Sequence, residues 1–304
     1  MIKNILNTLI VKIFPSIPLP IVRNISKRYV AGESLQYAIR AVKDLNKSGY
    51  YVTLDILGEH TETIKKSKQI TASYVKIYNT INKLNLNCNI SIKLSHIGLD
   101  INKKILNENF LLLLRKAKEF DNFLRIDMED SRMIEDTIGL YKLMKNKYSK
   151  VGPVIQAYLY RSYSDLKSLH RFGELNFRLC KGIYNESSNV AYKDKDEINK
   201  NFIKLMTYAF KNKIYICIAT HDINLIKSAY KLIKQLKIPN NMFEFQTLYG
   251  VPMHGWLEKH LENKFKVRIY VPFGADWYQY SFRRIKENPN IANYIIKNYF
   301  KKAN

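Results

Sequence analysis

Short apolar runs of strand character alternate with longer segments of helical periodicity along most of the chain. The runs are YVTLDILGE (51–59), NISIKLS (89–95), FLRIDMED (123–130), PVIQAYLY (153–160), NFRLCKG (176–182), IYICIAT (214–220), MFEFQTLYG (242–250) and VRIYVPFG (267–274). Their starts lie roughly 23 to 38 residues apart, which is the length of one strand followed by one helix. Eight such units predict an α/β fold, a closed parallel (β/α)8 barrel of the TIM type.

A doubly wound parallel sheet is the alternative fold for this alternation. It would require a glycine-rich phosphate-binding turn after the first strand, and neither GxGxxG nor GKS or GKT occurs in the sequence. The segments between the runs have helical spacing, as in 71–84, where one apolar stripe consists of Tyr74, Ile77, Ile81 and Leu84. We therefore expect an N-terminal helical arm over residues 1–48 and the barrel over residues 49–304.

The net charge of +24 is unusually high for a chain in which 25% of the residues are charged. Such a charge attracts nucleic acid or an anionic membrane surface. The lysines are scattered, and Lys, Asn, Ile and Tyr are abundant together, which favours a drift in composition. We expect no nucleic-acid partner, because the tyrosines lie within strands and helices and are not interleaved with one basic patch. Peripheral contact with a membrane is the remaining alternative.

The N-terminal stretch 1–22 is apolar, but Lys3 and Lys12 interrupt it and three prolines break it. A spanning helix needs about 20 apolar residues, so we expect this stretch to pack against the barrel or to lie on a membrane surface. The three cysteines show no CxxC spacing, and no secretory leader is evident. These features predict a cytoplasmic protein in a reducing compartment, without a metal site.

Polar residues gather near the carboxyl ends of the eight runs, where the active site of such a barrel lies. They are Asp55, Glu59, Lys93, Asp127, Glu129, Asp130, Gln156, Arg161, Arg178, Lys181, Thr220, His221, Asp222, Glu244, Gln246 and Tyr270. Single members have simpler explanations. Asp222 could cap the next helix, and Lys93 could form an interior salt bridge with Asp127. Charges inside a barrel are costly unless they are paired, so the whole set predicts a binding site.

Cations near the fifth run point to an anionic or electron-rich ligand. Arg178 lies in the strand, whereas Lys181 belongs to the turn after it, where Gly182 lets the backbone bend. Arginine and lysine at one strand end suit such a ligand because both donate charged hydrogen bonds.

Two adjacent arginines, Arg283 and Arg284, lie in the segment YSFRRIKENP (280–289), which has helical character. A guanidinium presents a planar fork that matches a carboxylate and stays charged at any working pH. On a helix, Glu287 lies within reach of both arginines and would hold them in place. Taken alone, the stretch is more simply explained as a solvated helix face.

Nine short motifs follow one another in order along the chain. They are TLDILGE, SIKLS, RIDMED, VIQAYLYRS, FRLCKGIYNE, IATHD, EFQTLYG, VRIYVPFGADWYQY and the YxxRRxxE pattern of Tyr280, Arg283, Arg284 and Glu287. Together they resemble the stand-alone bacterial kind of the proline dehydrogenase family, over residues 29–289. The resemblance implies a distorted, flavin-bearing (β/α)8 barrel whose last helix lies over the barrel mouth.

The resemblance also implies a reaction. Members of this family oxidise L-proline to Δ1-pyrroline-5-carboxylate, and the electrons pass to FAD and then to a membrane quinone. We therefore expect a cytoplasmic enzyme that can contact the inner face of the membrane peripherally.

Individual roles follow from the same resemblance. Arg283 and Arg284 are implied to bind the proline carboxylate, and Glu59 to pair with the first arginine and gate the pocket. The other implied substrate-pocket residues are Lys93, Asp127, Leu248 and Tyr270, with Glu287 orienting the arginines. The residues implied to hold FAD are Gln156, Arg178, Lys181, Gly182, Thr220, His221 and Gln246. One departure is Asn185, where related enzymes can carry a large aromatic residue.

Two other enzyme classes remain open at this point. A barrel aldolase would use Lys93 or Lys181 as a Schiff-base amine. A flavin barrel of the folate-reductase sort would share the cofactor, but it gives no reason for the arginine doublet.

Overall fold

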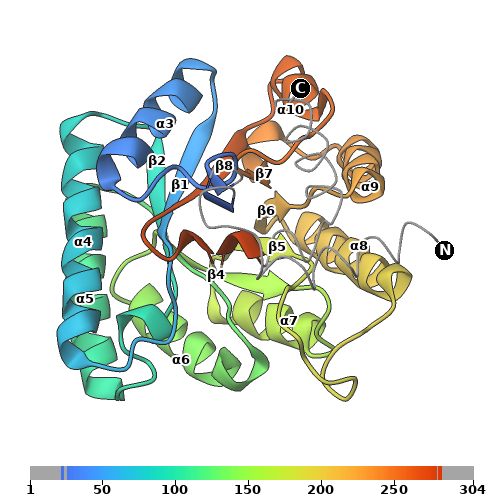
Figure 1. The fold of residues 1–304 in the computed structure, drawn as a ribbon. Helices are drawn as coiled ribbons and strands as arrows, with labels where there is room; N and C mark the ends of the chain where they lie inside the picture. Colours follow the sequence, from blue (N-terminus) through green and yellow to red (C-terminus); the bar gives the residue numbers. More distant parts are fainter. Residues whose placement is uncertain (1–21, 24–25, 279, 283–304) are drawn as a thin grey trace.

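Eight parallel strands close into one barrel, in the order in which they occur along the chain. The computed structural model describes residues 22–23, 26–278 and 280–282. The strands are β1 (Tyr51–Ile56), β2 (Cys88–Ile92), β3 (Leu124–Ile126), β4 (Val151–Gln156), β5 (Asn176–Cys180), β6 (Tyr215–Ala219), β7 (Phe243–Leu248) and β8 (Val267–Phe273). Each of the eight predicted runs overlaps one of them, with β2 beginning one residue and β4 two residues before its run, so the predicted (β/α)8 barrel is confirmed (Figure 1).

Helices surround the strands, as Figure 1 shows. They are α3 (Leu35–Lys47), α4 (Ile64–Lys83), α5 (Lys103–Glu119), α6 (Ile134–Lys145), α7 (Ser162–Phe172), α8 (Lys195–Lys211), α9 (Ile223–Gln235) and α10 (Trp256–Glu262). Short 3-10 turns occur at η2 (Ser95–Ile97), η3 (Ser131–Met133) and η4 (Asn240–Met242). The strands are buried on both faces, which explains why they read as continuous apolar runs.

Helix α3 occupies the place on the outer ring between β8 and β1, and it contacts both strands. It lies within the predicted arm, yet it packs on the barrel through Ala38, Ile39 and Val42. The boundary at residue 48 stays a prediction. The predicted helix over the mouth falls largely outside the described residues, and so do Arg283, Arg284 and Glu287.

Several helices begin at a polar side chain that caps the backbone. The side chain of Thr63 accepts a hydrogen bond from the backbone of α4, and Asn102 and Asp194 do the same for α5 and α8. Asp222 caps α9 in this way, so the simple explanation of that residue is correct.

The interior of the barrel near the amino ends of its strands, called the lower layer below, is polar. Branched aliphatic side chains are usual in this position. Glu244 accepts a hydrogen bond from Arg268 Nε at 2.7 Å. Arg125 donates to the carbonyl of Pro153 at 3.0 Å and to Asn176 Oδ1 at 2.6 Å. These buried charges are therefore paired or hydrogen-bonded, as burial requires.

Gly152 of β4 makes room for this lower layer. A methyl group there would lie 2.0 Å from the Asn176 carbonyl oxygen and 2.7 Å from Arg125 Nη1.

We expect Gly152→Ala to lower the free energy of unfolding by about 2 kcal/mol or more, because the backbone cannot give way. Urea unfolding measures the change. Gly139→Ala in α6 is the matched control: nothing lies within 4 Å of its added carbon, and it should stabilise by up to about 1 kcal/mol. Equal effects of the two changes would contradict the packing argument.

Candidate active site at the barrel mouth

Asp127 at the end of β3 is the centre of a hydrogen-bonded cluster. One oxygen accepts from Ser91 Oγ at 2.5 Å and from Arg178 Nη1 at 2.6 Å, and the other accepts from the Tyr270 hydroxyl at 2.9 Å. Burial opposes ionisation, but the charges of Arg178 and Lys93 prevail and lower the pKa of Asp127. Asp127 is therefore a fixed anion that accepts through both oxygens.

Lys93, just after β2, pairs with a different carboxylate. Its Nζ lies 2.6 Å from Asp55 Oδ2, so the simple explanation of a Lys93–Asp127 bridge is wrong in its partner. Burial raises the pKa of Asp55, against the effect of Lys93. Burial also works against a charged Lys93, but Asp55 and Asp127 raise the pKa of this lysine above its ordinary value. The pair holds a cation at the mouth.

Arg178 of β5 is held rigidly across the barrel. Its Nε donates to Gln246 Oε1 at 2.7 Å, and its guanidinium lies over the ring of Tyr270, 5.0 Å from the centroid. Gln246 in turn donates to Glu244 at 2.6 Å, which links the mouth to the lower layer. The remaining nitrogen, Arg178 Nη2, is buried and has no hydrogen-bond partner among the described residues.

Gln156 at the end of β4 has a second unsatisfied atom. Its Nε2 donates to the carbonyls of Met128 and Glu129 at 3.2 and 3.3 Å. Its Oε1 is buried and unpartnered within the described part of the chain. Buried polar atoms without partners are rare, and a ligand that donates to Gln156 Oε1 and accepts from Arg178 Nη2 would satisfy both.

The turns after β5 and β6 join at one ion pair. Lys181 Nζ lies 2.6 Å from Asp222 Oδ2, and Thr220 Oγ1 accepts from the backbone N–H of Asp222 at 3.1 Å. His221 Nε2 accepts from the backbone N–H of Leu248 at 3.0 Å, so this nitrogen carries no proton. These bonds fix the rim between β5 and β7.

Gly182 turns the chain, as the sequence predicts, with a φ of 107°. A methyl group there would lie 2.1 Å from the ring of Tyr158. The close approach of Tyr158 is a second reason for glycine that the sequence does not reveal.

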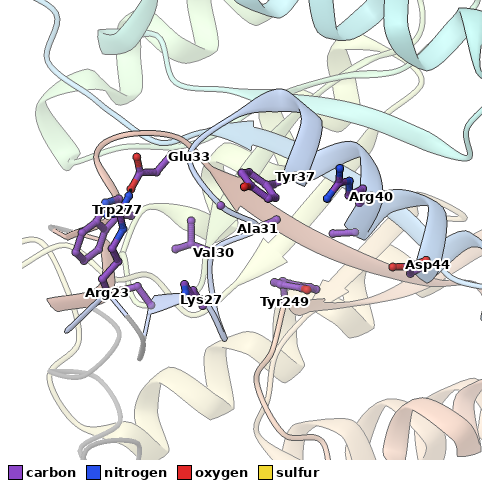
Figure 2. Close-up of a pocket in the computed structure, with 13 residues that line it drawn as sticks. Arg23, Lys27, Val30, Ala31, Glu33, Tyr37, Arg40, Asp44, Tyr249 and Trp277 are labelled. Carbon is purple, nitrogen blue, oxygen red and sulfur yellow. Dashed lines mark hydrogen bonds and ion pairs between the residues drawn. The ribbon is translucent and has the colours of Figure 1, made fainter. Parts of the chain in front are cut away.

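A separate hollow of about 590 Å³ lies between α3 and the segment that precedes it. Figure 2 shows Tyr37 and Tyr249 on its sides and Arg23 paired with Glu33 near Trp277. Among the described residues, none of the predicted site residues lines this hollow.

The comparisons with known proteins agree with this arrangement. The family model described as proline dehydrogenase matches residues 38–296. The chain belongs to the proline dehydrogenase family.

Relatives within the family cover most of the chain. Proline dehydrogenase 1 of Bacillus subtilis subsp. natto is 37% identical over 277 residues, which is 91% of each chain. The proline dehydrogenase of Deinococcus radiodurans is 35% identical over 284 residues, again 91% of each. A crystal structure of proline utilization A from Bdellovibrio bacteriovorus, inactivated by N-propargylglycine, matches with a TM-score of 0.82 and 25% identity. The match covers 88% of this chain and 33% of that longer one.

Most of the site residues predicted from the family resemblance meet at the mouth. The residues connected there by direct contacts or through a neighbour are Lys93, Asp127, Arg178, Lys181, Thr220, His221, Gln246, Leu248 and Tyr270. The carboxylate of Glu59 accepts a hydrogen bond from the Tyr184 hydroxyl at 3.3 Å. Arg283, Arg284 and Glu287 lie outside the described residues.

Tyr184 contacts the predicted gate residue Glu59, and the sequence reasoning did not single it out. It stands two positions after Gly182 and beside Asn185, and only its place in the turn after the fifth run gives a signal. Glu186 of the same turn accepts hydrogen bonds from the backbone and hydroxyl of Ser131, which ties this turn to the one after β3.

The described residues include neither a membrane-spanning helix nor a metal-binding cluster. None of the described helices combines the length and the apolar character that crossing a bilayer requires. Within the described ranges, no cluster of three His, Cys, Asp or Glu is arranged to hold a metal ion.

His96 of η2 gives a pH-dependent prediction. Burial, with the charges of Lys93 and Lys66, lowers the pKa of His96 to about 3, against about 6.5 when unfolded. Between these values the unfolded chain binds a proton that the folded chain does not, so stability falls as the pH falls through this window. We expect His96→Gln to reduce the slope by up to about 1.4 kcal/mol per pH unit.

Urea unfolding between about pH 6.5 and 4 measures that slope. His254→Gln, at an exposed position, is the control for the loss of a histidine side chain from the surface. If both variants have the wild-type slope, His96 is not the buried neutral base described here.

Proposed function

We propose that this chain oxidises L-proline to Δ1-pyrroline-5-carboxylate, holds FAD as its cofactor and passes the electrons to a membrane quinone. Membership of the family supports proline oxidation. The observation that carries the finer proposal is that two buried atoms, Arg178 Nη2 and Gln156 Oε1, have no hydrogen-bond partner within the described part of the chain. The edge of a flavin ring carries both hydrogen-bond donors and acceptors, so it fits such a pair.

The residues that would hold FAD come from β4 to β7 and the turns after them. They are Gln156, Arg178, Lys181, Gly182, Thr220, His221 and Gln246. When bound, FAD supplies a two-electron acceptor for hydride from the substrate carbon. Arg178 contributes a fixed positive charge beside the place where negative charge develops. Its bonds to Asp127 and Gln246 hold it ready, so little reorganisation is required.

The substrate would lie between these residues and the last helix. In this proposal, Arg283 and Arg284 bind the carboxylate of L-proline, Lys93 adds a cation, and Tyr270 and Leu248 contact the ring. Glu59 and Glu287 would orient the arginines. Asp127 holds Arg178 and Tyr270 and does not serve as a base, because both of its oxygens already accept hydrogen bonds.

The aldolase alternative is disfavoured by the pairing of the lysines. A Schiff-base amine needs a lowered pKa, whereas Asp55 and Asp127 raise the pKa of Lys93 despite its burial. Lys181 is likewise engaged by Asp222 at 2.6 Å.

The visible spectrum and the turnover of purified protein test the proposal. We expect flavin bands near about 380 and 450 nm, bleaching of the longer-wavelength band by L-proline without oxygen, and reoxidation by a quinone analogue. Arg178→Met should lower kcat by roughly 10²- to 10³-fold. Arg171→Met at the exposed end of α7 should leave turnover as it is. A colourless protein, or one whose bands ignore proline, would refute the proposal.

The arginine doublet gives a separate prediction about substrate binding. We expect Arg284→Lys to raise the KM for L-proline strongly, by roughly tenfold or more, because lysine has no planar fork. Flavin content, read from the absorbance spectrum, should stay at the wild-type level. Arg171→Lys is the control, and an unchanged KM in Arg284→Lys would mean that this side chain does not touch the substrate.

A further inference from the structure

Strands β1 and β2 part near the mouth. Their ladder ends at the pair Leu54 and Ile90, whereas the ladder between β1 and β8 continues to Ile56 and Phe273. In a continued parallel ladder, the N–H of Ile56 would point at β2. The parting of the strands removes that partner and opens a gap in the barrel wall beside Asp55.

Tyr74 of α4 fills this gap from outside the barrel. Its hydroxyl accepts the N–H of Ile56 at 3.3 Å and donates to Asp55 Oδ1 at 3.1 Å. The side chain of Tyr74 is fully buried, so no solvent replaces these bonds. One hydroxyl therefore takes the place of a backbone ladder and also holds a carboxylate.

Asp55 connects Tyr74 to the mouth. Its second oxygen lies 2.6 Å from Lys93 Nζ, and the Asp55 side chain is 2% exposed. A lysine side chain has several freely rotating bonds and no fixed direction of its own. Its ammonium group is therefore directed by Asp55, which accepts from the Tyr74 hydroxyl and also lies within hydrogen-bonding reach of Tyr270.

We propose that Tyr74 is a positioning residue for the reaction, acting through Asp55 to fix the ammonium group of Lys93 at the substrate pocket. The inference rests on the proposed function in one respect, which is that Lys93 contacts L-proline. The contacts that run from Tyr74 through Asp55 to Lys93 do not depend on it.

The electrostatics of Asp55 work in the same direction. The charged and titratable groups that face it are Lys93, Asp127, Tyr270 and Tyr74. Burial raises the pKa of Asp55, and hydrogen-bond donors oppose that rise. Losing the Tyr74 hydroxyl removes one donor, so Asp55 takes up a proton at higher pH and Lys93 loses its counter-ion there.

The same helix provides a matched control. Tyr78 lies one turn after Tyr74, is also fully buried, and its hydroxyl has no hydrogen-bond partner among the described residues. Tyr74→Phe and Tyr78→Phe therefore remove the same atom from the same helix, and only the first removes the contacts to Asp55 and Ile56.

Steady-state kinetics with L-proline provide the first test. We expect Tyr74→Phe to raise KM roughly three- to tenfold, with kcat within about twofold of wild type, and to move the acid limb of kcat/KM to higher pH. Tyr78→Phe should match the wild type in all three. An unchanged KM and an unmoved limb in Tyr74→Phe, while wild type turns over proline, would overturn the inference and leave the proposed function standing.

A double variant tests whether the effect passes through Lys93. In a Lys93→Met background, Tyr74→Phe should raise KM by less than about twofold further, because the ammonium group that it positions is gone. If Tyr74→Phe raises KM in the Lys93→Met background by as much as it does in the wild type, the effect of Tyr74 does not pass through Lys93, and the inference is refuted.

A measurement that does not need turnover separates the two proposals. Mass spectrometry after a short pulse of an amine-acylating reagent gives the rate of modification of Lys93. We expect this rate to rise several-fold in Tyr74→Phe and to stay at the wild-type value in Tyr78→Phe. If the wild type does not oxidise proline, the rate of Lys93 modification is the remaining test of the inference. Equal rates in Tyr74→Phe and Tyr78→Phe would overturn it.

Discussion

The buried ion pair between Arg178 and Asp127 is the interaction on which the mouth depends. It joins β3 to β5 across β4, and both partners are almost completely shielded from water. Removing one partner of such a pair costs about 3–5 kcal/mol, because the other is left as an uncompensated charge. Tyr270 and Gln246 are directed by this pair, so one electrostatic contact sets the position of side chains from four strands.

A polar interior gives this barrel a different kind of stability from one filled with aliphatic side chains. Hydrogen bonds link Arg178 through Gln246 and Glu244 to Arg268 in the lower layer. A network of this kind stabilises only when its members are satisfied. Arg178 Nη2, which has no partner among residues 22–23, 26–278 and 280–282, is thus a costly exception, and a bound ligand is one way to satisfy it.

The barrel was predictable because burial on both strand faces leaves continuous apolar runs, and the cluster at the strand ends was predictable because parallel strands share one carboxyl edge. The pairing of Lys93 with Asp55 was not predictable from the sequence, because it depends on how far β1 and β2 stay paired. Tyr184 and Tyr74 were missed for related reasons. Tyr184 lies in a turn without periodicity, and Tyr74 reads as an ordinary member of an apolar helix stripe, since its hydroxyl has no signature in the spacing.

The placement of α3 between β8 and β1 has a consequence for how the chain comes together. This helix precedes all eight barrel strands in the sequence, yet one of the two strands it covers, β8, is the last of the eight. The barrel therefore cannot close between β1 and β8 until β8 has been synthesised. Contacts of such long sequence separation slow folding, and the exposed edge of β1 must be kept from pairing with other chains throughout that wait.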